Sequence, residues 1–89
     1  MQATRSLADI AVDIWDDIDA QYPDGNRPNW WHYAKPYVEA MSYLNRIEDN
    51  YYQDSGRSVV LYLLANLTYW RGDTARSIKA ELKTMAGIN

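Results

Sequence analysis

Hydrophobic residues recur with a helical period in four segments of the chain. In the first segment, Ser6–Tyr22, apolar residues repeat at i, i+4, i+7 and i+11, which places them on one face of an amphipathic helix. These residues are Leu7, Ala11, Ile14 and Ile18. Ser6 suits the N-cap, and Asp9 lies three residues later, near the positive end of the helix dipole.

A loop and a second helix are predicted to follow. The run Pro23–Asn29 holds two prolines and one glycine, which is typical of a loop. A short turn is expected over Trp30–Ala34, and Pro36 suits the first position of a helix, where its missing N–H costs nothing. The polar stretch Glu48–Gln53 either continues this helix or frays.

A third helix is predicted after the break at Asp54-Ser55-Gly56, with Asp54 or Ser55 as its cap. Apolar residues cover most of its surface, which favours a central place in the fold. Its main stripe consists of Val60, Leu64, Leu67 and Trp70, widened by Val59 and Leu63.

The tripeptide Arg71-Gly72-Asp73 separates the third helix from a fourth. Gly72 suits the left-handed C′ position, and Asp73 or Thr74 suits the next N-cap. The fourth helix is expected to end at Gly87. Its predicted buried side consists of Ala75, Ile78, Leu82 and Met85.

Length and composition favour one all-α domain over residues 1–89, a compact bundle or orthogonal array of about four helices. The absence of cysteine excludes disulfides and thiolate metal sites, so packing, alone or with homodimer formation, must supply stability. The longest apolar stretch, 59–67, is interrupted by Asn66 and is too short to span a membrane. No secretory signal pattern is visible, and we expect a cytoplasmic protein.

Charge is unevenly distributed along the chain. Residues 1–56 carry four basic and ten acidic side chains, a net −6, whereas residues 57–89 carry five basic and two acidic ones, a net +3. Four aspartates of the first helix lie opposite its apolar stripe, namely Asp9, Asp13, Asp16 and Asp17. They form either an ordinary solvated face or a patch that docks on a basic partner surface, such as one that holds nucleic acid.

Basic residues gather instead near the fourth helix, at Arg71, Arg76, Lys79 and Lys83. With the short break before it, the helix pair resembles a helix-turn-helix unit, in which these side chains would contact DNA phosphates. Such residues also complement the dipole of a last helix. The acidic overall composition, with a pI near 4.9, makes direct DNA binding the less favoured alternative.

The aromatic residues are four Trp and eight Tyr, with no Phe. Tyr and Trp combine a large apolar body with a polar group, so they serve in cores and as anchors at protein interfaces. The candidate anchors follow the proline-rich loop or precede Gly56, and they are Trp30, Trp31, Tyr33, Tyr51 and Tyr52.

No residue pattern indicates an enzyme, a cofactor or a metal site. His32 is the one histidine and lies in the aromatic run 30–33, where an aromatic cluster explains it. All four glycines fall at predicted breaks, so no glycine-rich phosphate loop is present. We therefore expect a protein without catalytic residues.

The last part of the chain, about Tyr51–Lys83, resembles an uncharacterised small protein encoded by tailed bacteriophages and prophages. The resemblance is carried by Tyr51–Tyr62, Leu64–Asn66, Trp70–Arg76 and Lys79–Leu82. It implies a phage origin and a bacterial cytoplasm. In that setting we expect an interaction protein that modulates a host protein or protein–nucleic-acid complex, most concretely an anti-CRISPR-like inhibitor. A DNA-binding regulator and a phage assembly accessory protein are the alternatives.

Overall fold

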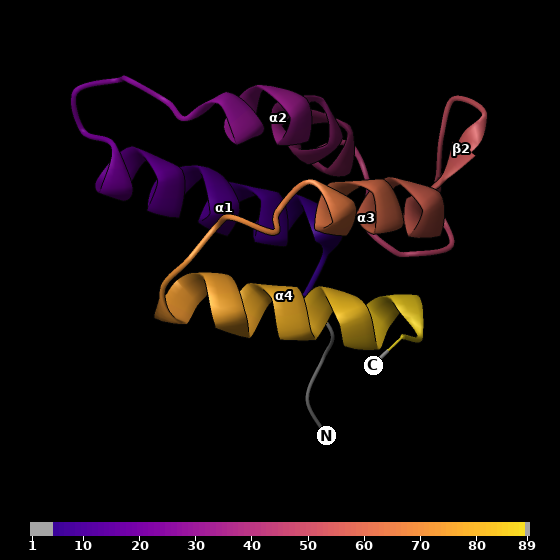
Figure 1. Ribbon diagram of the computed structural model, residues 1–89. Coiled ribbons are helices and arrows are strands. Elements are labelled where there is room, and N and C mark those ends of the chain that lie inside the picture. The colour runs from indigo at the N-terminus through magenta and orange to yellow at the C-terminus, as the bar shows by residue number, and fades with distance from the viewer. Residues whose placement is uncertain (1–4, 89) are drawn as a thin grey trace.

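The computed structural model describes residues 5–88, and their main elements are four helices (Figure 1). The helices are α1 (Leu7–Gln21), α2 (Asn29–Met41), α3 (Gly56–Ala65) and α4 (Asp73–Ala86). Two short strands, β1 (Asn50–Tyr51) and β2 (Asp54–Ser55), pair antiparallel as a hairpin between α2 and α3. The predicted all-α class is confirmed. None of the described helices is long and apolar enough to cross a membrane.

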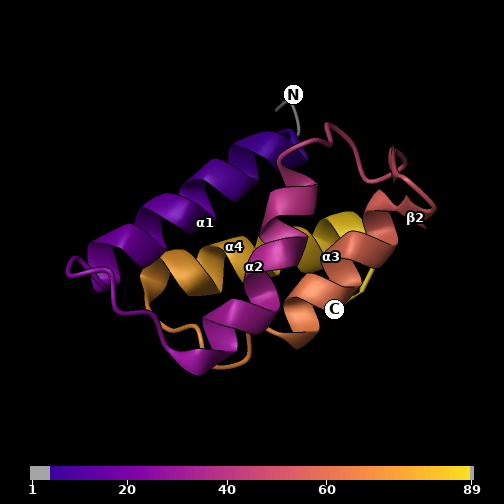
Figure 2. The same cartoon turned by 90° about the horizontal axis from the view of Figure 1, so that it is seen from above.

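The four helices pack around one core. In Figure 1, α2 and α3 lie above α4, and α1 packs against both α2 and α4. Figure 2 shows α2 and α3 side by side with opposite directions, so the start of α2 lies near the end of α3. α3 packs against α2, α4 and both strands, in agreement with its predicted central place.

The core is built from the apolar stripes of all four helices. The stripe predicted for α1 is fully buried, and Ile10 adds to it. Trp31 from α2 and Trp70, which precedes α4, are the two largest fully buried side chains. Burial of such side chains removes about 150–250 Å² each from water, so each of these tryptophans contributes strongly to the apolar surface that holds the helices together.

Three predicted helix ends are confirmed by their capping groups. The Ser6 hydroxyl accepts a hydrogen bond from the Asp9 N–H at 3.0 Å, and the Ser55 hydroxyl accepts one from the Ser58 N–H at 3.1 Å. Gly87 has φ of 77° and closes α4 in the left-handed conformation, which a residue without Cβ adopts readily.

The predicted start of the second helix at Pro36 is wrong. α2 begins at Asn29 with Pro28 as its N-cap, and Pro36 lies inside the helix. Its missing N–H leaves the carbonyl of His32 without an intrahelical donor, but both residues lie on the exposed face, where water can bind that carbonyl. Burial of Trp31 and Val38 on either side of the proline outweighs its poor helix propensity.

The segment after α2 neither continues the helix nor frays, contrary to both alternatives from the sequence. Residues 42–49 form turns, and the chain then enters the hairpin. The Asp49 carboxylate accepts hydrogen bonds from the backbone N–H groups of Arg46 and Asn45 at 3.0 Å each, which lower its pKa. A Cβ at Gly56 would lie 2.7 Å from the Ile47 carbonyl oxygen, so only glycine permits this close approach of the two segments.

α3 ends earlier than its apolar stripe predicts. Leu67 and Trp70 are buried as expected, but they lie in the connection 66–72 after the helix, and Leu64 is only half-buried. The Asn66 side chain donates to the Tyr62 carbonyl oxygen at 2.8 Å, a local bond that competes with continuation of the helix.

The tight turn predicted between the last two helices is also wrong. Gly72 has a positive φ of 116°, as expected, but it is the N-cap residue of α4 and not the C′ residue of α3. Asp73 is the first residue of α4 and not its cap. In α4, Met85 is half-buried, and Ala86 takes the buried place at the end of the helix.

Candidate functional site

The four aspartates predicted as one acidic patch on α1 divide into two kinds. Asp9 and Asp16 are exposed, and no ion pair within residues 5–88 involves them. Asp13 pairs with Arg5, and Asp17 accepts a hydrogen bond from the Trp70 indole N–H at 2.7 Å. Half of the predicted patch therefore holds the fold together.

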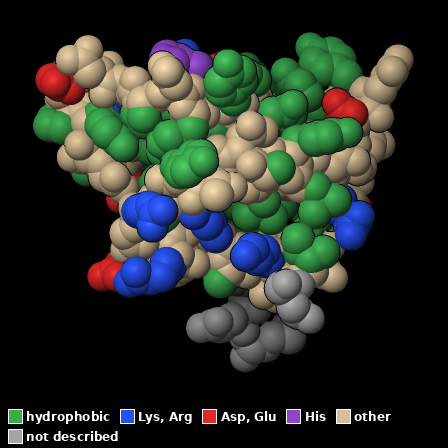
Figure 3. Space-filling model, viewed as in Figure 1, with side chains coloured by type: hydrophobic (Ala, Val, Ile, Leu, Met, Phe, Trp, Pro, Cys, Tyr) green, Lys and Arg blue, Asp and Glu red, His purple; other side chains and the backbone are tan. Residues whose placement is uncertain are grey.

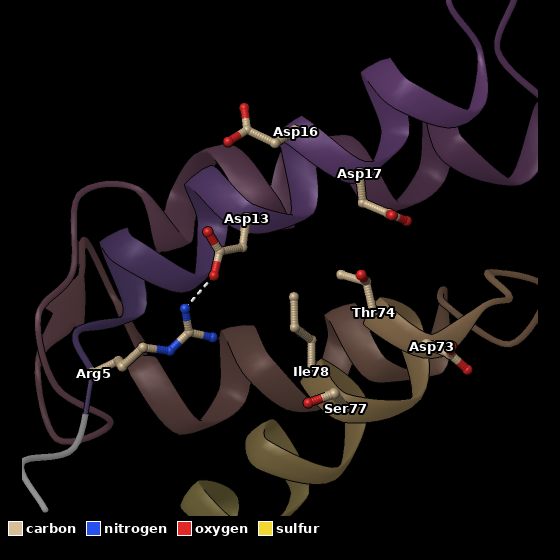
Figure 4. A pocket seen from close by; sticks show the side chains of 8 residues that line it. All are labelled: Arg5, Asp13, Asp16, Asp17, Asp73, Thr74, Ser77 and Ile78. Atoms are coloured by element: carbon tan, nitrogen blue, oxygen red, sulfur yellow. Dashed lines mark hydrogen bonds and ion pairs between the residues drawn. The ribbon is translucent and has the colours of Figure 1, made fainter.

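A groove of about 580 Å³ runs between α1 and α4 (Figure 4). Asp13, Asp17, Thr74 and Ile78 point into it, whereas Asp16 and Asp73 point away from it. Arg5 closes one end and donates to Glu81 of α4 at 2.7 and 3.1 Å as well as to Asp13. These carboxylates raise the pKa of Arg5, which stays cationic and links α1 to α4.

Aromatic rings are exposed on α2, on α3 and on the segments that follow these helices. Along the whole described chain, residues 5–88, six large hydrophobic side chains are strongly exposed, and only Val12 among them comes from α1 or α4. The other five are 55–87% exposed and come from α2, α3 and the segments that follow them: Tyr33, Tyr43, Tyr52, Tyr62 and Tyr69.

We call the surface formed by Trp30, Tyr33, Tyr37, Tyr62 and Tyr69 the aromatic face. The rings of Tyr37 and Tyr62 stack across α2 and α3 with centroids 5.7 Å apart. A groove of about 330 Å³ opens where α2 begins and α3 ends, and Trp30, Tyr33 and Tyr69 line it. The two helices run in opposite directions (Figure 2), which brings Tyr37 onto Tyr62 and Tyr33 into one groove with Tyr69.

The predicted aromatic anchors have different outcomes. Tyr33 is 70% exposed and Tyr52 is 87% exposed, whereas Trp30 and Tyr51 are half-buried. The prediction for Trp31 is wrong, because its ring is 2% exposed and packs edge-on against Trp15 with centroids 5.0 Å apart. The α2 stripe of Trp31, Ala34, Val38 and Met41 turns this residue toward the core and its neighbours outward.

Sequence reasoning missed three exposed tyrosines. Tyr62 and Tyr69 adjoin the apolar stripe of α3 and were indistinguishable from core residues by period alone. Tyr43 stacks on Tyr51 of the hairpin with centroids 5.9 Å apart. A hairpin after α2 was not predicted, so no sequence signal could have placed this pair together.

The basic residues of the DNA-binding alternative also fall into two groups, those with a side-chain bond within the described molecule and those exposed without one. Arg76 pairs with Asp73, and Lys79 donates to the Trp70 carbonyl oxygen at 2.6 Å. Arg71 and Lys83 are exposed. The connection before α4 spans residues 66–72, longer than the ~3–4-residue turn of a helix-turn-helix unit. The structure therefore does not place these side chains on a recognition helix of that type.

The described residues offer no evident catalytic constellation. His32 is exposed, and no hydrogen bond within residues 5–88 joins its side chain to a nucleophile or a carboxylate. Over the same part of the chain, no group of three His, Cys, Asp or Glu side chains is arranged to hold a metal ion. The chain matches no protein-family model, no curated protein and no solved structure.

Proposed function

We propose that this chain is a phage-encoded, non-enzymatic interaction protein that binds a host protein through the aromatic face of α2 and α3. In its most concrete form, it inhibits a nucleic-acid-handling defence complex of the bacterial cytoplasm, as an anti-CRISPR protein does. The observation that carries this proposal is the set of exposed rings on α2, α3 and the segment after α3, where Tyr33 and Tyr69 line one groove and Tyr37 stacks on Tyr62.

Tyrosine and tryptophan are the residues that most often anchor protein interfaces. The aromatic face offers a ring pair, a groove, and hydroxyl groups at its surface that can bond a partner. A ring with few torsion angles loses little conformational entropy when it is buried, so such side chains contribute contact area efficiently.

The negative charge of the chain favours a partner with a basic surface. The net charge is −3, and the exposed carboxylates of Asp9 and Asp16 add to the field that a basic surface meets on approach. Surfaces that hold nucleic acid are rich in arginine, and an arginine guanidinium stacks well on a tyrosine ring. The arginines of such a partner would thus be attracted by the negative charge of the chain and would also contact the tyrosine rings of the aromatic face.

The test is capture of host proteins from a nuclease-treated bacterial lysate by the tagged chain and by two variants. Tyr33→Ser with Tyr62→Ser removes two anchors, and Val12→Ser is the matched control, because it removes an exposed apolar side chain from α1. A nucleic-acid-binding host protein retained in stoichiometric amount by the native chain and the control, but lost with the tyrosine variant, supports the proposal.

Equal retention by the tyrosine variant contradicts the role of the aromatic face. Light scattering measures whether the native chain forms a homodimer. If homodimer formation is the one interaction that the tyrosine changes abolish, the result contradicts binding to a host protein. Replacement of Asp9 and Asp16 by Asn sharpens the result further. It should slow association and weaken its dependence on salt while the retained protein stays the same.

A further inference from the structure

A row of cations lies along α4, on the side where α4 meets α3. In Figure 3 the Lys and Arg side chains gather over α4, while Asp and Glu side chains lie at the edges of that view. The row begins at Arg71, continues with Lys79 and Lys83, and reaches Arg57, whose guanidinium donates to the Ala86 carbonyl oxygen at 2.9 Å.

Both carboxylates of α4 are paired with arginines that do not belong to the row. Asp73 pairs with Arg76, and Glu81 accepts from Arg5 on the side that faces α1. No ion pair within residues 5–88 involves Arg71, Lys79 or Lys83. These three positive charges therefore repel one another without compensation inside the described molecule.

The surroundings of Lys79 disfavour its charged form. Partial burial, followed by the nearby positive charges of Arg71 and Lys83, lowers its pKa. Its ammonium group lies 2.6 Å from the Trp70 carbonyl oxygen, which draws it to the start of the helix. A bound anion would relieve this repulsion, and three cations in a row match an anion with several negative groups.

An aromatic groove adjoins this row. Tyr69 precedes Trp70 and lies two residues before Arg71, and it lines the groove with Trp30 and Tyr33. Flat rings beside a cationic track are the combination with which proteins bind single-stranded nucleic acid, since phosphates contact the cations and unpaired bases stack on the rings. A duplex keeps its bases stacked inside and cannot use such rings.

We propose that Arg71, Lys79 and Lys83 bind the phosphates of a single-stranded nucleic acid, with a base stacked on Tyr69. This activity does not require a host protein, but Tyr69 and Tyr33 line the same groove, so a bound strand and a bound protein would compete for it. The geometry differs from that of a helix-turn-helix regulator, because no helix enters a groove of DNA and unpaired bases are required.

The test is fluorescence anisotropy with a labelled single strand of ~12 nucleotides at about 50 mM salt. Three phosphate contacts predict a slope of log affinity against log salt near −2, since each contributes about −0.7 on single strands. Arg71→Gln with Lys83→Gln should weaken binding at least about tenfold and bring the slope to about −0.7, the value for one contact. Neither side chain bonds within the described residues, so the variant should fold.

The matched control is Lys35→Gln with Arg46→Gln, which also removes one lysine and one arginine charge, but from positions outside the row. It should bind within about twofold of the native chain, apart from the general effect of net charge. Tyr69→Leu should weaken binding of the single strand about tenfold with an unchanged salt slope.

Three results would overturn the proposal: no binding at low salt, equal loss in the control and row variants, or a duplex of the same length that binds as tightly as the single strand. None of these results decides the capture experiment. The lysate used there is treated with nuclease, and the variants compared there keep Tyr69 and the cations of the row unchanged.

Discussion

The two sides of the molecule use their polar and aromatic residues in opposite ways. Between α1 and α4, charged side chains are bonded to one another or to the core, as in the Arg5 link and the Asp17–Trp70 bond. Between α2 and α3, tyrosine rings remain exposed. We infer that the first side maintains the fold and that the second is available for a partner. Substitutions on the two sides should therefore affect different properties.

The largest expected contrast is between two neighbours on α2. Trp31→Ala should lower the free energy of unfolding by about 3–5 kcal/mol, because it leaves a cavity in the core. Tyr33→Ala should change it by less than about 0.5 kcal/mol, since that ring is exposed. Urea unfolding followed by circular dichroism measures both. Comparable losses in the two variants would show that the aromatic face is part of the core.

The second contrast is between two neighbours on α1. Asp17→Ala leaves the buried indole N–H of Trp70 without its acceptor and should cost about 1–3 kcal/mol. Asp16→Ala removes an exposed carboxylate and should change stability by less than about 0.5 kcal/mol. Thermal melts of the pair decide the point, and equal melting temperatures would mean that the α1 aspartates are a uniform solvated face.

The third prediction concerns the link between α1 and α4. Arg5→Ala should cost about 0.5–1 kcal/mol, a modest value because Arg5 and both of its partners are partly exposed and screened by water. About 1 M salt should reduce the difference from the native chain, which melts at low and high salt would show. A difference that persists in salt would point to packing of the arginine stem rather than to its charge.

The smallest expected effect depends on pH and lies in the segment between α2 and the hairpin. The pKa of Asp49 is lowered below its ordinary 3.8 by the backbone N–H groups of Arg46 and Asn45. The unfolded chain therefore binds more protons between the lowered pKa and 3.8, so the stabilisation by Asp49 is complete above that window and is lost as pH falls through it. An NMR titration of the Asp49 carboxyl carbon should give a midpoint below 3.8. A midpoint at or above 3.8 would show that these hydrogen bonds do not persist in solution.

The sequence was most informative where local chemistry decides the structure. The α1 stripe and the caps at Ser6, Ser55 and Gly87 were predicted correctly, because periodicity and capping depend on neighbours within about one turn. It was misleading at Pro36 and at the end of α3, where tertiary burial and the Asn66 side chain outweigh propensity.

The surfaces were less predictable than the helices. Pattern alone could not separate Trp31 from Tyr33 without the correct start of α2, nor Asp17 from Asp16 without the position of Trp70. The aromatic face requires the antiparallel arrangement of α2 and α3, which brings Tyr37 onto Tyr62. Such contacts depend on tertiary structure, and a single sequence contains no local signal for them.

The central claim is that the exposed tyrosines bind a partner while the bonded charges between α1 and α4, Asp17 and the Arg5 link, stabilise the fold. One paired measurement tests it. The Tyr33→Ser, Tyr62→Ser variant and the Asp17→Ala variant are each melted and then used for capture from nuclease-treated lysate at a temperature where both are folded. We predict that the tyrosine variant melts like the native chain but retains no host protein, whereas Asp17→Ala melts lower and retains the same protein in the same amount. Loss of capture with Asp17→Ala and full capture with the tyrosine variant would contradict this account.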